Sequence, residues 1–284
     1  MTAPDRPRRR ALVVGGSTGI GRGVADAWAE AGLDVTVLSR SRPTGPGAER
    51  LRWAATDLTD ADRVAENLSL ATTEPLHAVC YSAVHYGDRR ALFRECTEAE
   101  WRRQLDVNLH GLWLTLSWAV PVLRRPDRPG VFLGISSEVV YNAGPGRSGY
   151  AATKAAAAAL LDSVAQEETT ELPGTEALRI VQALPAGMVD TPGIRRRRPD
   201  GFDYTAYMRP ASFAPLAREL AATAGAGLHG AHLVVDPEGG WRPVGAGLPV
   251  SQSQPVPAAV TARAGAGAGA GTRAGAGAAP GAGS

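Results

Sequence analysis

Short apolar runs and longer amphipathic or alanine-rich stretches alternate along most of this chain. The apolar runs have the length of buried strands, and the longer stretches have the length and apolar spacing of helices. The predicted strands are 11–14, 35–38, 51–54, 76–81, 131–135, 178–184 and 232–235, and the predicted helices are 19–31, 61–71, 97–123, 149–168 and 213–222. Repeated strand–helix–strand units predict an α/β fold, with one doubly wound parallel sheet and helices on both of its faces.

Composition divides the chain into a long central segment and two ends that differ from it. Residues 1–9 are polar and basic, and we expect a flexible arm there. Residues 10–250 have the length of one domain with a sizeable core. Residues 251–284 are mostly Ala, Gly, Pro and Ser, a composition that cannot bury enough apolar surface to fold. We therefore expect a disordered low-complexity tail.

Charge and cysteine content exclude several classes of function. The formal net charge of +2 is too small to indicate a nucleic-acid partner. The chain has no apolar run of about 18 residues, so we expect no membrane span. Cys80 and Cys96 have the spacing of neither a metal site nor a redox pair. We expect no bound metal, and two free thiols in a cytoplasmic protein.

A glycine-rich segment, Gly15-Gly16-Ser17-Thr18-Gly19-Ile20-Gly21, joins the first predicted strand to the first predicted helix. Glycines permit a tight turn and the close approach of a pyrophosphate, whose charge the helix N-terminus stabilises. A plain strand-to-helix connection is the alternative interpretation. Its place in the first such connection of a doubly wound sheet favours a dinucleotide site. The predicted contacts are Gly15, Ser17, Thr18, Gly19, Ile20 and Gly21.

This segment resembles the phosphate-binding turn of the short-chain dehydrogenase/reductase family, which carries T-G-x3-G-x-G at this place. The glycines match, and Val14 stands where threonine is usual. The resemblance covers about residues 10–240. It implies a single Rossmann-type domain with a mobile substrate lid at about 193–211.

The end of the second predicted strand bears on the choice of nicotinamide cofactor. A carboxylate there hydrogen-bonds the ribose of NAD, whereas an arginine offers a donor fork to the 2′-phosphate of NADP. This chain has Ser39-Arg40, so we expect NADPH, with Arg40 as the main contact and Ser39 beside it. Arg42 or Arg22 is expected to assist. A solvated basic loop is the alternative interpretation.

The resemblance implies further cofactor contacts after the third and sixth predicted strands. Asp57 matches the family's contact to the adenine amino group, although capping of the following turn is a nearly equal alternative. Thr191 matches the family's contact to the nicotinamide carboxamide. The same comparison adds Leu58, Gly187 and Val189 to the expected contacts.

Tyr150 and Lys154 lie four residues apart on a predicted helix and so share one face. A free phenol titrates at about pH 10, and a nearby ammonium lowers that pKa. Ser137 follows the fifth predicted strand, at the edge of the sheet that faces the cofactor crevice. Asn108 lies in the middle of the predicted helix 97–123.

The resemblance assigns a role to each member of the family's tetrad. Tyr150 is the acid or base, Lys154 lowers its pKa and binds the nicotinamide ribose, and Ser137 polarises the carbonyl. Asn108 holds a water of the proton relay, with a local backbone bond as its alternative role. Ser136 is an alternative to Ser137.

Two segments depart from the family's pattern or have no assigned role. The chain has Tyr81-Ser82-Ala83-Val84 where the family usually has Asn-Asn-Ala-Gly, which indicates a divergent subgroup. Within the expected lid, the run Arg195-Arg196-Arg197-Arg198 is either a solvated loop or a contact for an anionic substrate or an acidic carrier protein.

These features predict an NADPH-dependent carbonyl reductase that interconverts a ketone and a secondary alcohol. The substrate is expected to be a small molecule, and it is anionic or carrier-bound if the arginine run contacts it. An epimerase or dehydratase that uses bound NAD(P) is an alternative, although its usual glycine spacing and larger substrate domain do not appear. A non-catalytic NADP-sensing protein is another alternative, against which the complete tetrad argues. The resemblance also implies a homodimer or homotetramer.

Overall fold

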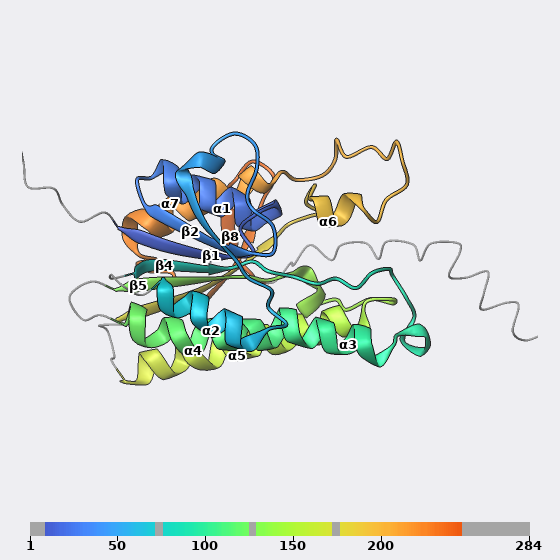
Figure 1. The fold of residues 1–284 in the computed structure, drawn as a ribbon, viewed down its shortest axis with the longest axis horizontal. Helices are drawn as coiled ribbons and strands as arrows, with labels where there is room; N and C mark the ends of the chain where they lie inside the picture. The colour runs from blue at the N-terminus through green and yellow to red at the C-terminus, as the bar shows by residue number, and fades with distance from the viewer. Residues whose placement is uncertain (1–8, 72–75, 125–128, 172–176, 246–284) are drawn as a thin grey trace, which may run out of the picture. The chain divides into compact units, whose positions relative to one another are not determined.

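The computed structural model describes residues 9–71, 76–124, 129–171 and 177–245. Apart from residue 9, the expected arm lies outside these residues, as does the tail 251–284. The described strands form one sheet in the order β3-β2-β1-β4-β5-β6-β7-β8, in which β1 to β7 are parallel and β8 is antiparallel (Figure 1). The strands are β1 (Arg10–Val14), β2 (Asp34–Ser39), β3 (Leu51–Ala55), β4 (Leu76–Tyr81), β5 (Gly130–Ile135), β6 (Leu178–Pro185), β7 (Ala231–Val235) and β8 (Trp241–Pro243).

Helices cover both faces of the sheet. In Figure 1, α1 and α7 lie on one face, and α2, α4 and α5 lie on the other. The helices are α1 (Gly19–Glu30), α2 (Ala61–Leu70), α3 (Glu98–Leu105), α4 (Gly111–Leu123), α5 (Ser148–Glu171), α6 (Pro192–Arg195) and α7 (Ala214–Thr223). Shorter turns of helix are η1 (Ala48–Arg50), η2 (Phe93–Glu95), η4 (Glu138–Val140) and η5 (Pro210–Phe213), and η3 (Asp106–His110) is a π-helix. The predicted α/β class with a doubly wound sheet is confirmed.

The sheet separates two apolar cores. Its central strands are buried on both faces, as the continuous apolar runs predict: all six residues of β5 are buried. On the α1 side, Trp28 is fully buried and its indole donates to the Ala217 carbonyl oxygen at 2.8 Å, which ties α1 to α7. On the other side, Phe132 and Leu161 belong to the core beneath α4 and α5.

The structure differs from the sequence prediction in three places. The predicted helix 97–123 is interrupted by η3, where the helix widens by one residue per turn. The short helix α6 lies at the start of the expected lid, at about 193–211, where no helix was predicted. Strand β8 was not predicted because three residues are too few to show an alternating pattern, and it forms a hairpin with β7. Among the described helices, none combines the length and apolar character that crossing a bilayer requires.

Candidate active site

The turn after β1 has the geometry of a phosphate cradle. Gly15 has a φ of 82°, and a Cβ on this residue would overlap the backbone of Ala83. A Cβ on Gly21 would overlap the Gly15 carbonyl oxygen. Thr18 makes no side-chain capping bond at the start of α1, whose first turn contains no acidic residue. The first amide groups of α1 thus have no side-chain partner from the cap and suit an anionic group.

The remaining side chains of this turn support its shape. Ile20 is half-buried and packs against the core below the turn. Ser17 accepts a hydrogen bond of 3.4 Å from the Ser41 hydroxyl, which links the turn to the segment after β2. In place of the family's threonine, Val14 is buried, and its carbonyl oxygen accepts from the Ser82 amide at 2.9 Å.

Two cations are exposed at the end of β2. Ser39 is buried and donates its hydroxyl to the Ser41 carbonyl oxygen at 2.9 Å, while Arg40 and Arg42 are exposed. Arg22 is engaged in a different way. Its Nε lies 2.8 Å from both oxygens of Asp26, and its Nη atoms donate to the carbonyl oxygens of Thr44 and Pro46. Arg22 therefore fixes the loop after β2, which leaves Arg40 and Arg42 as the cations available to a ligand there.

Asp57 follows β3 and caps the next turn. Its Oδ1 accepts from the Thr59 amide at 3.0 Å and from the Thr59 hydroxyl at 2.9 Å. The bond from the Thr59 amide is the main cause that lowers the pKa of Asp57, and the charge of Arg40 lowers it further. The capping role is thus present in the structure, and a contact to adenine stays a prediction. Leu58 is buried beside Gly111, at the start of α4.

Tyr150 and Ser137 meet at the carboxyl end of β5. Tyr150 lies in the first turn of α5 and is 8% exposed, and Ser137 is 6% exposed. Burial raises the pKa of Tyr150 well above its ordinary value, and a hydrogen bond with Ser137 opposes that rise. The Tyr86 ring packs against Tyr150, with 4.9 Å between the ring centroids. The phenol is therefore neutral at pH 7 and carries the proton that a reduction requires.

Lys154 is the only lysine of the chain. The residue is 5% exposed and lies one turn after Tyr150, and its ammonium donates to the Ile135 carbonyl oxygen at 2.7 Å. Burial lowers the pKa of Lys154 to about 8. The Tyr150 pKa is raised by burial, against the expected lowering, and Lys154 is not among the groups that shift it; Ser137 and Arg147 oppose the rise.

Asn108 lies in the π-helix η3 and holds the loop after β4. Its Oδ1 accepts from the His85 amide at 2.7 Å, and its Nδ2 donates to the His85 carbonyl oxygen at 2.9 Å and to Thr153 Oγ1 at 3.0 Å. The side chain thus bonds the loop after β4 and helix α5, and not its own local backbone, which was its alternative role. Holding a water of the relay stays a prediction. π-Turns within helices are frequent at functional sites.

The divergent segment Tyr81–Val84 fits this π-helix. The buried Tyr81 hydroxyl donates to the Val107 carbonyl oxygen within η3. Val84 packs with Tyr86 against Tyr150, and its φ is not among the positive values of the described residues. A glycine is therefore not required at Val84, and the segment differs from the family pattern without backbone strain.

Both ends of the lid lie against α1. At one end, the buried Thr191 packs its methyl group on Gly19. The Thr191 hydroxyl caps the N-terminus of α6. At the other end, the backbone of Pro210 occupies the place of a Cβ on Gly23. A bridge between Val189 and Met208 closes the base of the lid. Gly187 is exposed just before that bridge.

The lid's arginines have different partners. Arg195 lies 2.6 Å from Asp190 and is exposed, and Arg196 is exposed as well. Arg197 lies over the Tyr86 ring, 5.1 Å from its centroid. Arg198 donates to the Tyr207 hydroxyl at 2.9 and 3.1 Å. The four arginines of the predicted run therefore do not form one surface: Arg197 lies over Tyr86, the neighbour of Tyr150, and Arg198 contacts Tyr207 within the lid.

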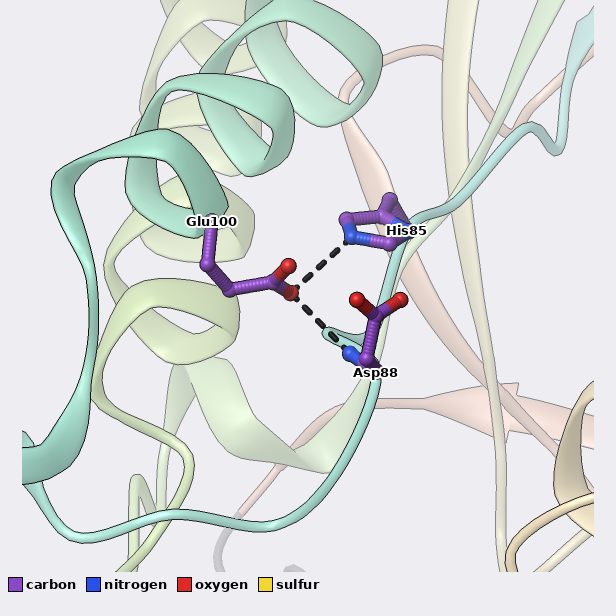
Figure 2. Close-up of side chains that lie close together, drawn as sticks. All are labelled: His85, Asp88 and Glu100. Carbon is purple, nitrogen blue, oxygen red and sulfur yellow. Dashed lines mark hydrogen bonds and ion pairs between the residues drawn. The ribbon is translucent and has the colours of Figure 1, made fainter.

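The fold also gathers His85, Asp88 and Glu100, whose ligand-type atoms lie within 4.8 Å of one another. Figure 2 shows Glu100 Oε1 between its two partners, His85 Nε2 at 2.9 Å and the Asp88 amide at 3.1 Å. Burial lowers the pKa of Arg197, and the two carboxylates oppose that lowering, so its guanidinium is close to them. Protein groups thus balance the charge of this cluster, which fixes the loop after β4 beside Asn108.

The comparisons with known proteins agree with this geometry. The family model for short chain dehydrogenases matches residues 9–200. The chain belongs to the short-chain dehydrogenase family. Members of this family are NAD(P)-dependent oxidoreductases that act on CH–OH and C=O groups, and this chain is one of them.

Curated relatives match most of the domain. A 3-oxoacyl-[acyl-carrier-protein] reductase of Chlamydia muridarum is 28% identical over 195 residues, which cover 64% of this chain and 75% of the relative. A galactitol 2-dehydrogenase of Rhizobium johnstonii is 29% identical over 216 residues, 67% of this chain and 83% of the relative. These two relatives act on different substrates, so the family alone does not identify a substrate for this short-chain dehydrogenase.

Solved structures share the fold. A short-chain type dehydrogenase/reductase from Mycobacterium ulcerans is 26% identical, with a TM-score of 0.68 over 81% of this chain and 89% of that chain. A 3-ketoacyl-(acyl-carrier-protein) reductase from Brucella melitensis, solved with NADH, is 20% identical, with a TM-score of 0.70 over 81% of this chain and 98% of that chain. ElxO, solved with NADP, has a TM-score of 0.69 at 19% identity, over 82% of this chain and 98% of that chain. The cofactor of this protein must therefore be argued from its own residues.

Glu138 is a site residue to which the sequence analysis gave no role. Its Oε2 accepts from the Ser137 hydroxyl at 3.1 Å, and its Oε1 accepts from Arg147 at 3.1 Å. The position of Glu138 directly after Ser137 was the sequence signal that could have suggested a role. Its ion pair with Arg147 depends on the fold. Ser136 instead lines a small internal cavity with Lys154, so Ser137 is the serine that contacts Tyr150.

Proposed function

We propose that this short-chain dehydrogenase is an NADPH-dependent carbonyl reductase in which Tyr150 delivers the proton. One observation carries the proposal: the buried Tyr150 phenol lies close enough to the buried Ser137 to feel its hydroxyl, and one helical turn before the buried Lys154. A neutral phenol, a hydroxyl donor and an ammonium in one small site match the needs of carbonyl reduction.

The proposed cofactor is NADPH, with NADH as the weaker ligand. The close-packed glycines Gly15 and Gly21 leave room for a pyrophosphate, and the N-terminus of α1 has no side-chain cap that would compete with it. The end of β2 presents Arg40 and Arg42 to solvent and places no acidic residue in the segment 39–42. A guanidinium there suits a 2′-phosphate, whereas a carboxylate would repel it. The further proposed cofactor contacts are Ser17, Thr18, Gly19 and Ile20 of the glycine turn, together with Ser39, Asp57, Leu58, Gly187, Val189 and Thr191.

The chain's own residues would divide the work as follows. A bound nicotinamide supplies the hydride. Ser137 holds the carbonyl oxygen by turning its hydroxyl from Glu138 to the substrate, and the Tyr150 phenol gives that oxygen its proton. Lys154 then stabilises the tyrosinate by its charge and binds the nicotinamide ribose. Asn108 keeps the loop after β4 in place beside these groups and is proposed to hold a water of the proton relay.

A substrate screen tests the proposed function. We expect NADPH oxidation with at least one member of a panel of ketones that includes keto acids, sugars and carrier-bound 3-oxoacyl groups. Product formation would be followed by mass spectrometry, with the Tyr150→Phe protein as the matched inactive control. NADPH binding without turnover of any panel member would contradict a reductase and would favour a nucleotide-sensing protein.

Arg40→Asp should exchange the cofactor preference. The variant replaces the donor fork with a carboxylate that repels a 2′-phosphate and can accept from the NAD ribose. A charge-assisted contact is worth about 1.5–3 kcal/mol, so the Kd for NADPH should rise roughly 10- to 100-fold. Calorimetric titration with both cofactors measures the change, and Arg52→Asp, which alters an exposed arginine of β3, is the control. Equal or tighter NADH binding by the unmodified protein would refute the proposed preference.

A further inference from the structure

Three arginines from separate parts of the chain come together, and the charge of one of them, Arg147, acts on Tyr150. Arg90 comes from the loop after β4, Arg147 directly precedes α5, and Arg198 comes from the lid. Burial and then the charges of Arg147 and Arg198 lower the pKa of Arg90, so both of these guanidiniums lie near that of Arg90. Like charges in a partly buried place repel one another, and an anion between them would remove that cost.

The loop at 144–147 contains Arg147 and binds the side chain of Arg90. The Arg90 Nε and Nη2 atoms donate to the Pro145 carbonyl oxygen at 3.2 and 2.8 Å. The Arg90 side chain packs on Gly146, and the Arg147 guanidinium packs on Gly144; both glycines have positive φ. A side chain on either glycine would overlap an arginine, so the loop is shaped around this pair.

The charge of Arg90 is not balanced by a carboxylate within the described residues. Arg147 pairs with Glu138 at 3.1 Å, whereas Arg90 forms no ion pair in the part of the chain that the structure describes. The Arg147 Nε is buried and has no hydrogen-bond partner there. The Arg147 carbonyl oxygen accepts from the Ala151 amide, so the N-terminus of α5, which has no acidic residue in its first turn, adds further positive potential.

The arginine cluster lies where the substrate is expected to bind, and away from the proposed nucleotide contacts. Arg147 lies three residues before Tyr150, and its charge acts on the Tyr150 phenol. Its partner Glu138 accepts from Ser137. The proposed nucleotide contacts instead lie at the glycine turn and at the end of β2, on other strands of the sheet. An anion held by Arg90 and Arg147 would therefore belong to the molecule whose carbonyl reaches Tyr150.

We propose that Arg90, Arg147 and the N-terminus of α5 form a subsite for an anionic group of the carbonyl substrate, a carboxylate or a phosphate, which Arg198 of the lid covers. This inference rests on the proposed reductase function and specifies its substrate class. Arginine forks bind both anions through paired hydrogen bonds, so the two chemical sources must be separated by experiment.

The test compares matched carbonyl compounds with and without the anion. Acetoacetate is paired with acetoacetamide for the carboxylate, and dihydroxyacetone phosphate is paired with dihydroxyacetone for the phosphate. For at least one pair, we expect the intact protein to favour the anionic member by about tenfold or more in kcat/KM. Arg90→Gln should remove most of this preference by raising KM for the anionic member, with the neutral member and the NADPH Kd changed less than about twofold.

Two further variants separate the charge of Arg90 from its structural role. Arg90→Lys keeps a cation that can still donate to Pro145, so it should retain part of the preference. Arg195→Gln makes the same charge change on the lid at an exposed residue paired with Asp190, and it should leave the preference unchanged. High salt should reduce the preference of the intact protein to the extent that the site is open to solvent.

Calorimetric titration with the same four compounds, with and without NADPH, keeps the two proposals distinguishable. Arg90-dependent binding of an anionic member without turnover would support the subsite and contradict the reductase. Equal turnover of the charged and neutral members by the intact protein would support the reductase and overturn the subsite. The subsite is also overturned if no anionic member binds, or if Arg90→Gln leaves the preference intact.

Discussion

Replacing Tyr150 with phenylalanine is expected to lower kcat by about 10²–10⁴-fold, because the substrate oxygen loses its positioned proton donor. The change removes one oxygen from a buried ring that packs against Tyr86, so the fold and the NADPH Kd should change little. Stopped-flow NADPH oxidation and calorimetry measure the two quantities on the same preparation.

A matched variant makes this test specific. Tyr86→Phe removes a phenol from the neighbouring ring, which the proposed mechanism does not use as a proton donor, and should leave kcat within about tenfold of the parent. Ser137→Ala should lower kcat because the carbonyl loses its hydroxyl donor. Near-normal turnover by Tyr150→Phe would show that the active site has been assigned to the wrong residue.

Lys154 should titrate near pH 8, and replacing it should raise the stability of the free protein while lowering its activity. Burial lowers the pKa of Lys154 to about 8, from an ordinary value of 10.5. Between these values the unfolded chain keeps a proton that the folded protein releases, so stability should rise as pH increases from about 8 to about 10.5. Below pH 8 the folded protein carries the full cost of a buried ammonium.

Lys154→Met should therefore stabilise the free protein at pH 7, by on the order of 2 kcal/mol after the loss of the bond to Ile135. The same variant should lose most of its turnover and NADPH affinity, since the lysine is proposed to serve both the phenol and the nicotinamide ribose. Urea unfolding at pH 7 and pH 10 measures the stability difference, which should shrink at the higher pH.

The chain offers a direct measurement of this pKa. Because Lys154 is the only lysine, lysine labelled with ¹³C gives one set of side-chain signals, whose titration reports this ammonium alone. An ordinary pKa near 10.5, or a variant that is less stable than the parent at both pH values, would contradict the buried-ammonium account.

Features that depend on neighbours in the sequence were predictable. The turn at Gly15–Gly21 was recognised from glycine spacing between a strand and a helix, and the pair Tyr150 and Lys154 from the helical repeat. Both rules concern a few consecutive residues, so they can be applied without knowledge of the tertiary structure.

Features that depend on packing were not predictable. The π-helix η3 breaks a continuous helical pattern because Tyr81, Asn108 and the loop after β4 are fitted together in space. The pKa of Tyr150 was expected to fall because helical spacing shows its neighbour Lys154 but not its burial. The arginine cluster of Arg90, Arg147 and Arg198 joins residues more than fifty positions apart, which no local pattern indicates.

The contacts of Gly19 and Gly23 with the two ends of the lid have a mechanical consequence. These glycines are four residues apart, about one turn of α1, so both ends of the loop stand on one face of the nucleotide-side helix. The lid is thus attached to α1 at two points about one turn apart. Because Thr191 and Pro210 are restrained there, any movement of the lid must occur in the residues between them, which include Arg197 over the Tyr86 ring.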